Sequence, residues 1–227
     1  MDSYTTKRGQ LEAYFDRTAA ETWARLTSDA PVSRIRQTVR AGRDEMRAEL
    51  LARLPEDLAG ARVLDAGCGA GQMAVALASR GAEVVAVDIS PKLLRVAEER
   101  TPQELKGQIT YLAGDMLDER HGQFDHVIAM DSLIHYAPLD ILGALRRLTP
   151  RVTGSIAFTV APRTPALAAM HRLGKLFPRA DRSPAIHPVG ARHLTRLITE
   201  SLPGWRAHET RRIARGFYIS EAWELAR

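Results

Sequence analysis

Cysteine, aromatic residues and long apolar runs are scarce in this sequence. Cys68 is the single cysteine among 227 residues, so no disulfide can form within the chain, and a reducing compartment is the simple inference. No uncharged apolar stretch reaches the roughly 18 residues that a membrane span needs. The beginning of the chain is polar and charged and has no apolar core of a signal peptide. These absences predict a cytoplasmic protein without a transmembrane segment.

The charge balance is mildly basic. Lys and Arg number 32 against 27 Asp and Glu, which gives a formal charge of +5. Such an excess fits an anionic partner, without choosing between nucleic acid, a membrane surface and a carboxylate ligand. Aromatic residues make up only 6% and do not interleave with the arginines as they do in a platform for single-stranded nucleic acid. We therefore expect no nucleic-acid partner.

From residue 60 onward, short apolar runs alternate with helical segments. Five of these runs end before residue 161, and helical segments follow most of them. Two further strands are expected over 205–213 and 216–225, close enough in sequence to pair as an antiparallel hairpin. The pattern predicts an α/β fold with a seven-stranded, mostly parallel sheet and an antiparallel hairpin at one edge.

Two other segments differ from this pattern. Residues 7–54 have helical periodicity, so we expect an N-terminal helical arm or cap over 1–55 and an α/β domain over 56–227. The proline-rich stretch 161–190 is long for a connection in a compact domain, which is typical of a lid or a substrate-binding insertion.

The second half of the arm carries a stripe of arginines beside an apolar face. Steps of four, three and four residues keep these arginines on one side of a helix. The stripe consists of Arg36, Arg40, Arg43 and Arg47. The simplest interpretation is that these arginines form the solvent-exposed face of the helix.

The stretch "VLDAGCGAG" is the most informative in the chain. A strand ends, Gly67, Gly69 and Gly71 follow, and a helix begins. Glycines let a backbone turn tightly and let a ligand approach the main chain, and such a strand–loop–helix binds nucleotide-like ligands at the carboxyl end of a sheet. The dinucleotide fingerprint G-x-G-x-x-G would need a glycine at Gln72, so the spacing disfavours NAD and a pyrophosphate.

This G-x-G-x-G loop resembles that of the class I S-adenosylmethionine-dependent methyltransferases, because the next strand ends in Asp88 and the third ends in "GDM". The resemblance implies a Rossmann-like fold and S-adenosylmethionine as methyl donor. It places Asp88 at the ribose hydroxyls, Asp115 at the adenine amino group and Asp65 at the methionine end. The expected cofactor-binding residues are Asp65, Gly67, Gly69, Gly71, Asp88, Ile89, Asp115, Met116 and Asp131. Taken alone, Asp88 also fits a cap for the helix after it.

Further segments resemble the magnesium-protoporphyrin IX O-methyltransferases of chlorophyll and bacteriochlorophyll synthesis. These are "YFD" with Trp23, "FDHVIAMDSLIHY", "FTVAPRT", "LGKLFP" and "GFYIS". The resemblance implies methylation of one propionate of magnesium protoporphyrin IX, a magnesium chelatase porphyrin-binding subunit as partner, and a position at the photosynthetic membrane surface. The chain departs from the family pattern at Arg163 and at Arg179–Ala180, which leaves the fit of the substrate less defined than the reaction.

The implied chemistry needs no general base. A propionate has a pKa of about 4.3 and is already an anion at neutral pH. Its attack on a sulfonium methyl partly cancels two charges, so the enzyme should align the reacting groups and exclude water. We expect the arm to close over the site and Tyr14 and His135 to act as catalytic residues that orient the carboxylate. Two alternatives stay open for His135, namely an axial contact with the magnesium and a structural hydrogen bond at the strand end.

A cation should hold the second, unreacted propionate, and no metal site made by the protein itself is expected. The candidates for this cation are Arg34, Arg36, Arg40, Arg163 and Arg179. Competing functions are a methyltransferase of another small carboxylate, phenol or amine, an RNA methyltransferase suggested by the basic charge, and a non-catalytic S-adenosylmethionine-binding or porphyrin-carrier protein.

Overall fold

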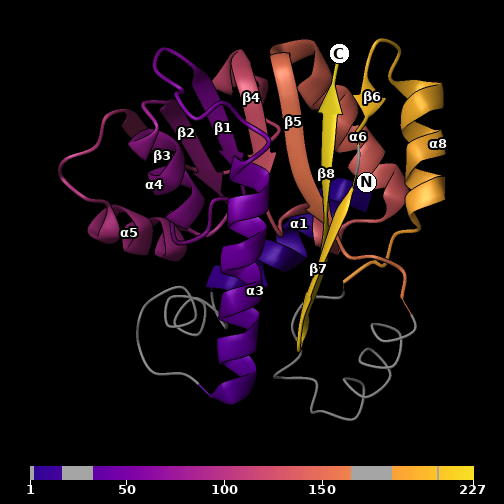
Figure 1. Cartoon of the computed structure of the whole chain (residues 1–227), viewed down its shortest axis with the longest axis horizontal. Helices are drawn as coiled ribbons and strands as arrows, with labels where there is room; N and C mark the ends of the chain where they lie inside the picture. Colours follow the sequence, from indigo (N-terminus) through magenta and orange to yellow (C-terminus); the bar gives the residue numbers. More distant parts are fainter. Residues whose placement is uncertain (1–2, 17–32, 165–185, 209) are drawn as a thin grey trace.

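One twisted sheet runs through the molecule and has helices on both faces (Figure 1). The computed structural model describes residues 3–16, 33–164, 186–208 and 210–227. The strands lie in the order β3-β2-β1-β4-β5-β8-β6, and β7 also pairs with β8. Their bounds are β1 Arg62–Ala66, β2 Glu83–Asp88, β3 Gln108–Ala113, β4 Phe124–Ala129, β5 Val152–Val160, β6 Arg206–Ala207, β7 Arg211–Arg215 and β8 Tyr218–Ala226. The first five strands are parallel and β7 is antiparallel to β8, as the sequence predicts, and β8 is also antiparallel to β5.

The helices form two layers. Apolar residues of α3 and α4 pack with Leu94 of α5 on one face of the sheet, and α1, α6 and α8 cover the other. Their bounds are α1 Ser3–Tyr14, α3 Arg34–Leu51, α4 Gln72–Ser79, α5 Pro91–Arg100, α6 Pro138–Leu148 and α8 Ala191–Ser201, with short 3₁₀ turns at η2 Glu119–His121, η3 Leu133–His135 and η4 Thr149–Arg151. Helix α5 starts as its sequence predicts, because the Ser90 side chain accepts a hydrogen bond from the Leu93 N–H and Pro91 occupies the first turn.

The predicted strand over 205–213 is present as two short strands. β6 pairs with the carboxyl half of β8, at Leu225 and Ala226, and β7 pairs with its amino half through a tight turn at Gly216. The long β8 therefore lies between β5 on one side and β6 and β7 on the other. The sequence shows one uninterrupted polar–apolar segment there, so its division was not predicted.

The sheet topology positions a site at one edge. The carboxyl ends of β1, β2, β4 and β5 lie at the lower edge of the sheet in Figure 1, where α1 crosses below them. The amino-terminal half of α3 and the β7–β8 turn extend past the same edge. In open α/β sheets the crevice outside the carboxyl ends of the strands is the usual ligand site.

Residues 161–190 are described only at their two ends. Pro162 forms a bridge with Val189, and the Arg163 N–H donates to the Val189 carbonyl at 3.0 Å. The predicted lid lies mostly outside the described residues and stays a prediction, as does the division of the chain at residue 55.

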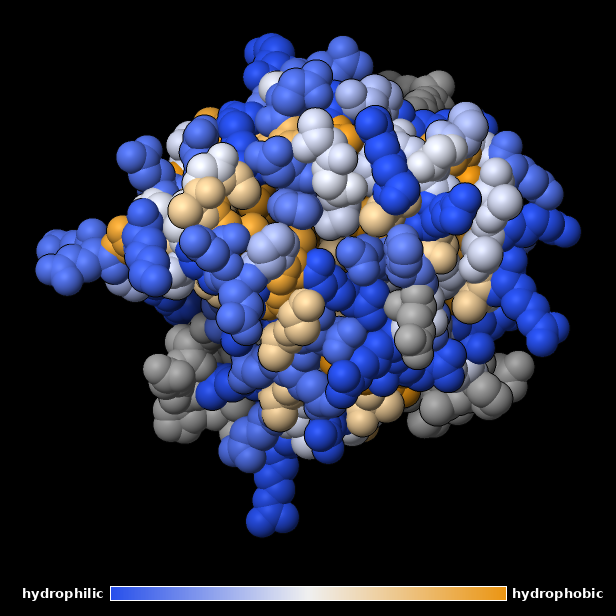
Figure 2. All heavy atoms as spheres, turned by 45° about the horizontal axis from the view of Figure 1, so that its top comes forward, coloured by the Kyte–Doolittle hydropathy of each residue, from blue (hydrophilic) through white to orange (hydrophobic). Residues whose placement is uncertain are grey.

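Hydrophilic side chains cover most of the face seen in Figure 2, and hydrophobic ones show between them. Among the described residues, the large hydrophobic side chains that are exposed are Ile35, Leu139 and Phe217. In the described ranges, no helix combines the length and the hydropathy that crossing a membrane requires.

We expect Trp223→Ala to lower the free energy of unfolding by about 3–5 kcal/mol. Trp223 is 1% exposed and its ring stacks on Phe158 at 6.1 Å, so the truncation leaves a cavity between β5 and β8. Urea denaturation followed by circular dichroism measures the change. Phe217→Ala is the matched control, since Phe217 is 54% exposed and its loss should change stability by less than about 0.5 kcal/mol. Equal effects of the two substitutions would contradict the packing described here.

Candidate active site

The glycine loop closes tightly between β1 and α4. The N–H groups of Gly67 and Cys68 both donate to the Val87 carbonyl, at 2.8 and 3.0 Å. Gly67 and Gly71 have φ angles of 83° and 81°, which side chains of L residues rarely adopt. A Cβ on Gly67 would lie 2.5 Å from the Ser132 Cβ. The loop therefore needs glycine for its shape and for its close contact with the segment after β4.

Asp88 lies at the end of β2, under this loop. Its Oδ2 accepts from the Gly69 N–H at 2.8 Å, and its Oδ1 accepts from the Ser90 N–H at 2.9 Å. Burial raises the pKa of Asp88, and these N–H groups oppose the rise. Each carboxylate oxygen has two acceptor positions, so Asp88 retains acceptor capacity for a ligand hydroxyl group. The helix cap suggested by the sequence is wrong for Asp88, because Ser90 caps α5, and the ribose contact stays a prediction.

Asp65, at the end of β1, is the most deeply buried carboxylate of the site. It is 1% exposed, and its Oδ2 has no hydrogen-bond partner among the described residues. Burial, followed by the nearby charge of Asp88, raises the pKa of Asp65 to about 7, and the Ala74 N–H opposes this. A buried acceptor without a donor is costly, so this position suits the positively charged group of a ligand.

Helix α3 brings two arginines to the same place. Arg43 and Arg47 line a small cavity together with Asp65, Gly67, Cys68, Ala70, Gln72, Met73 and Met130. The Arg43 side chain is 18% exposed and pairs with Asp131 at 2.7 Å, while Arg47 pairs with Asp44 at 2.6 Å.

The solvated-face interpretation is therefore wrong for Arg43 and Arg47, although Arg36 is exposed. Each of the two stands three residues before an apolar core residue, Met46 or Leu50, which places it at the border of the buried face. This three-residue spacing is visible in the sequence, and it indicates that the arginine stripe borders the protein interior at Arg43 and Arg47.

Helix α1 docks onto the third carboxylate, Asp115. The Tyr4 hydroxyl donates to Oδ1 at 2.7 Å, and Arg8 donates to Oδ2 at 2.8 Å. The Leu117 N–H also donates to Oδ1, at 2.9 Å. Burial raises the pKa of Tyr4 above its usual range, which keeps this hydroxyl a donor. The adenine contact of Asp115 stays a prediction, and Tyr4 and Arg8 are site residues that the sequence analysis missed.

The aromatic end of the arm lies beside the loop after β4. The Phe15 ring contacts Tyr14 at 5.2 Å and His135 at 5.9 Å between centroids, both edge-on. His135 is 7% exposed in the short turn η3. The structure thus brings the two predicted catalytic residues into one cluster, and Phe15 is a third member that was not predicted.

Asp131 begins the loop that contains His135. Its Oδ1 accepts from the hydroxyls of Tyr218 and Thr159, at 3.0 and 3.3 Å, and its Oδ2 accepts from Arg43. Direct cofactor binding by Asp131 stays a prediction, as it does for Ile89 and Met116, which lie partly buried and buried near the ends of β2 and β3.

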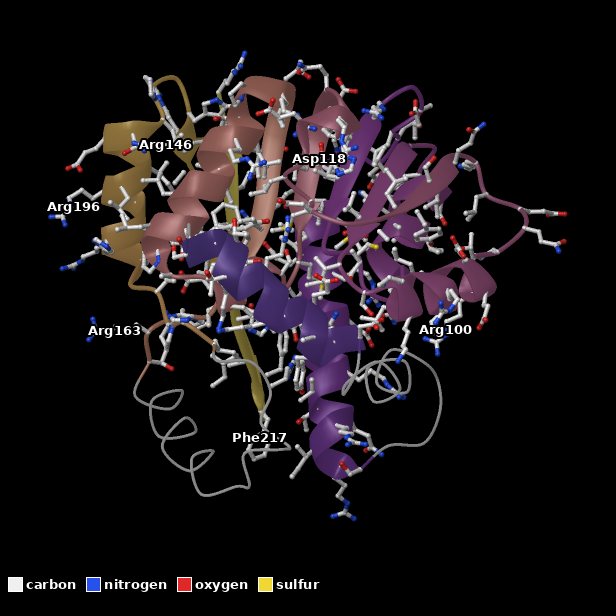
Figure 3. The ribbon with its side chains drawn as sticks, turned by 180° about the vertical axis from the view of Figure 1, so that it is seen from behind. Arg100, Asp118, Arg146, Arg163, Arg196 and Phe217 are labelled. Atoms are coloured by element: carbon white, nitrogen blue, oxygen red, sulfur yellow. The ribbon has the colours of Figure 1, made fainter. Side chains whose placement is uncertain are left out.

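Several candidates of the sequence analysis fall elsewhere. Arg163 is exposed, and Figure 3 shows its side chain pointing outward at the edge of the sheet where Phe217 also lies. Arg34 and Arg36 are exposed on α3, and Arg40 is half-buried. Trp23 and Arg179 lie outside the described residues.

Two protein families match overlapping parts of this chain. A family model described as "Methyltransferase domain" matches residues 63–152, and one described as "Magnesium-protoporphyrin IX methyltransferase C-terminus" matches 129–227. A magnesium-protoporphyrin O-methyltransferase of Rhodobacter capsulatus is 54% identical over 222 residues, which cover 97% of each chain. The chain belongs to the magnesium-protoporphyrin O-methyltransferase family.

More distant members of this family agree in sequence and in fold. The enzyme of the same name from Synechocystis sp. is 28% identical over 94% of each chain. The crystal structure of the Synechocystis magnesium protoporphyrin IX methyltransferase with bound SAH has a TM-score of 0.81 and 27% identity, and the match covers 96% of this chain and 99% of that one. The predicted class I methyltransferase fold is thus confirmed.

Cofactor binding should depend on pH through Asp65. Below a pKa of about 7 this carboxyl is protonated and neutral, and its predicted contact with the ammonium group of the ligand requires it to lose that proton. We therefore expect the affinity for S-adenosylhomocysteine to fall by about tenfold for each pH unit below that value, and to be flat just above it. Isothermal titration calorimetry from pH 5.5 to 8 measures this.

Asp65→Asn provides the control for this pH dependence. It has the same shape without the titrating proton, so its affinity should be weaker at pH 8 and nearly independent of pH. An unchanged slope in Asp65→Asn would show that another group titrates.

Proposed function

We propose that the protein transfers the methyl group of S-adenosylmethionine to a propionate carboxylate of magnesium protoporphyrin IX, as part of chlorophyll or bacteriochlorophyll synthesis. The products are the monomethyl ester and S-adenosylhomocysteine. The observation that carries this proposal is the 54% identity to the Rhodobacter capsulatus enzyme along 97% of both chains. The glycine loop and the carboxylates at the ends of the strands support this proposal, because their hydrogen-bond donors and acceptors match the polar groups of the cofactor.

Each end of the cofactor has its own partners in this proposal. Asp88 accepts from the ribose hydroxyls, and Asp115 with Met116 holds the adenine. Asp65 pairs with the ammonium group of the methionine end. Arg43 and Arg47 face the same cavity and hold the carboxylate there, since guanidinium groups pair well with carboxylates.

Positioning and exclusion of water supply the catalysis. The propionate is an anion at neutral pH, and water solvates the separated reactant charges better than the dispersed charge of the transition state. A site closed against water removes that penalty and holds the oxygen in line with the methyl and the sulfur. Helix α1, tied to Asp115 by Tyr4 and Arg8, places the arm over the carboxyl end of the sheet.

His135 and Tyr14 orient the reacting carboxylate in this mechanism. Both side chains contact the Phe15 ring, so this ring fixes them relative to each other. A ring N–H of His135 and the hydroxyl of Tyr14 donate hydrogen bonds to the propionate, and neither residue removes a proton. Tyr136 takes no part, because it is buried and stacks on Tyr4 at 5.0 Å.

The partners follow from the substrate and its source. A magnesium porphyrin is apolar and sparingly soluble, so direct transfer from the porphyrin-binding subunit of a magnesium chelatase is the expected delivery. The formal charge of +5 supports contact with an acidic protein surface or with an anionic photosynthetic membrane.

The acceptor is tested by incubating the purified protein with magnesium protoporphyrin IX and S-adenosylmethionine. Mass spectrometry should show one added methyl, absent when the S-adenosylmethionine is omitted. Tight S-adenosylhomocysteine binding without methylation would keep the cofactor site but discard the acceptor, and other small carboxylates and phenols would then be assayed.

His135→Ala should lower kcat by roughly 10²-fold, because the carboxylate loses its orientation, while the Kd of S-adenosylhomocysteine stays unchanged. Steady-state kinetics and calorimetry measure the two quantities. His126→Ala is the matched control, since His126 is a half-buried histidine in β4 that bonds to Ser155. A loss of activity that follows the loss of thermal stability in both variants would contradict a role for His135 in positioning the carboxylate.

A further inference from the structure

The backbone at Asp131 is strained. With φ at 56°, it is the one residue other than glycine with a positive φ in the described part of the chain. Such a conformation persists only where the surroundings hold it, and it is found most often at functional sites. The contacts that hold Asp131 therefore indicate what the strain serves.

Three elements converge on this carboxylate. Thr159 of β5 forms a reciprocal pair with Asp131, accepting from its N–H at 2.7 Å and donating to Oδ1 at 3.3 Å. The Tyr218 hydroxyl of β8 donates to the same Oδ1 at 3.0 Å. Arg43 of α3 donates to Oδ2 at 2.7 Å. Asp131 thus links the C-terminal hairpin, which β7 and β8 form, to Arg43, which lines the cavity beside Asp65.

The ring of Tyr218 also lies directly on α3. A Cβ on Gly42 would come within 2.6–2.9 Å of the Tyr218 side chain. Glycine at this position allows the ring to pass against the helix backbone and the hydroxyl to reach Asp131 beyond it. Since Gly42 directly precedes Arg43, Tyr218 contacts the helix at the residue before the arginine and also holds the arginine's ion-pair partner.

We infer that Tyr218 is a positioning residue of the cofactor site, which fixes Asp131 and through it directs the Arg43 guanidinium to the carboxylate of S-adenosylmethionine. The inference rests on the proposed role of Arg43. It assigns a function in cofactor affinity to the C-terminal hairpin, which is remote in sequence from the glycine loop.

The ion pair between Asp131 and Arg43 depends on the hydroxyl group of Tyr218. The Asp131 side chain is 8% exposed, so each of its acceptor positions needs a protein donor. Burial, and then the negative charge of Asp131, raises the pKa of Tyr218 well above its usual value, so the hydroxyl keeps its proton and donates. Without this donor, only the longer bond from Thr159 remains at Oδ1, so Arg43 is drawn toward the carboxylate and away from the cofactor.

Tyr218→Phe removes the hydroxyl and keeps the ring on Gly42. We expect the Kd of S-adenosylhomocysteine to rise by about 5- to 20-fold, which is part of the effect of one hydrogen bond to a charged group, because Tyr218 acts through Asp131 and Arg43. The Kd of 5′-methylthioadenosine should not change, because this ligand has the adenosine and the sulfur but no amino-acid end. Calorimetry on the full-length protein gives both constants.

Arg215→Gln is the matched control on the same hairpin. Arg215 pairs with Glu45 of α3 at 2.7 Å on the exposed side, so its loss loosens the same contact between hairpin and helix without touching Asp131. Both ligands should bind this variant as they bind the parent protein. Equal weakening of the two ligands by Tyr218→Phe would mean that the tyrosine only supports the fold, and would overturn the inference.

A double-mutant cycle with Arg43→Ala completes the test. If Tyr218 acts through Arg43, then Tyr218→Phe should add nothing to the loss already caused by Arg43→Ala. Additive losses would overturn the inference and leave the proposed function intact. Normal binding by Arg43→Ala would overturn the assigned role of Arg43, and the inference with it, while methylation of the porphyrin would still stand as a separate result.

Discussion

Four carboxylates meet at one edge of the sheet, and the structure around them depends on how their charges are balanced. Asp65 and Asp88 are among the last residues of β1 and β2, and Asp115 and Asp131 lie two residues after the ends of β3 and β4. Burial raises the pKa of Asp65 and of Asp88, and the nearby charge of Asp88 raises that of Asp65 further. Donors that balance these charges include backbone N–H groups, Tyr4 and Arg8 of α1, Arg43 of α3, Thr159 of β5 and Tyr218 of β8.

Asp65 is the exception in this row. Its Oδ2 has no donor in the described part of the chain, and it titrates at about 7. A cationic group suits this position, and the ammonium of S-adenosylmethionine is the partner that we propose for it. In this proposal the buried carboxylate recognises the cofactor by its charge, and the glycine loop recognises it by its shape.

Local motifs indicated this edge in the sequence, because each carboxylate lies within two residues of the end of its own strand and the glycine loop is contiguous. The donors opposite them could not be found in the same way. Tyr4 is 111 residues from Asp115, and Tyr218 is 87 residues from Asp131. Only the three-dimensional fold brings such pairs together, and although the helical spacing to Met46 indicates that Arg43 borders the buried face, it does not identify Asp131 as its partner. The division between β6 and β7 also depends on pairing with the distant β8.

The packing of α3 also has a consequence for the order in which the molecule forms. Its apolar residues Met46 and Leu50 lie in one cluster with Ile213 and Tyr218 of the C-terminal hairpin. At about 5–20 residues per second, ribosomes make Tyr218 on the order of 10–35 s after Gly42. Throughout that interval α3 lacks its contacts with the hairpin, and part of its apolar surface stays exposed. With the inferred role of Tyr218, full cofactor affinity is acquired only after the last strand has entered the sheet.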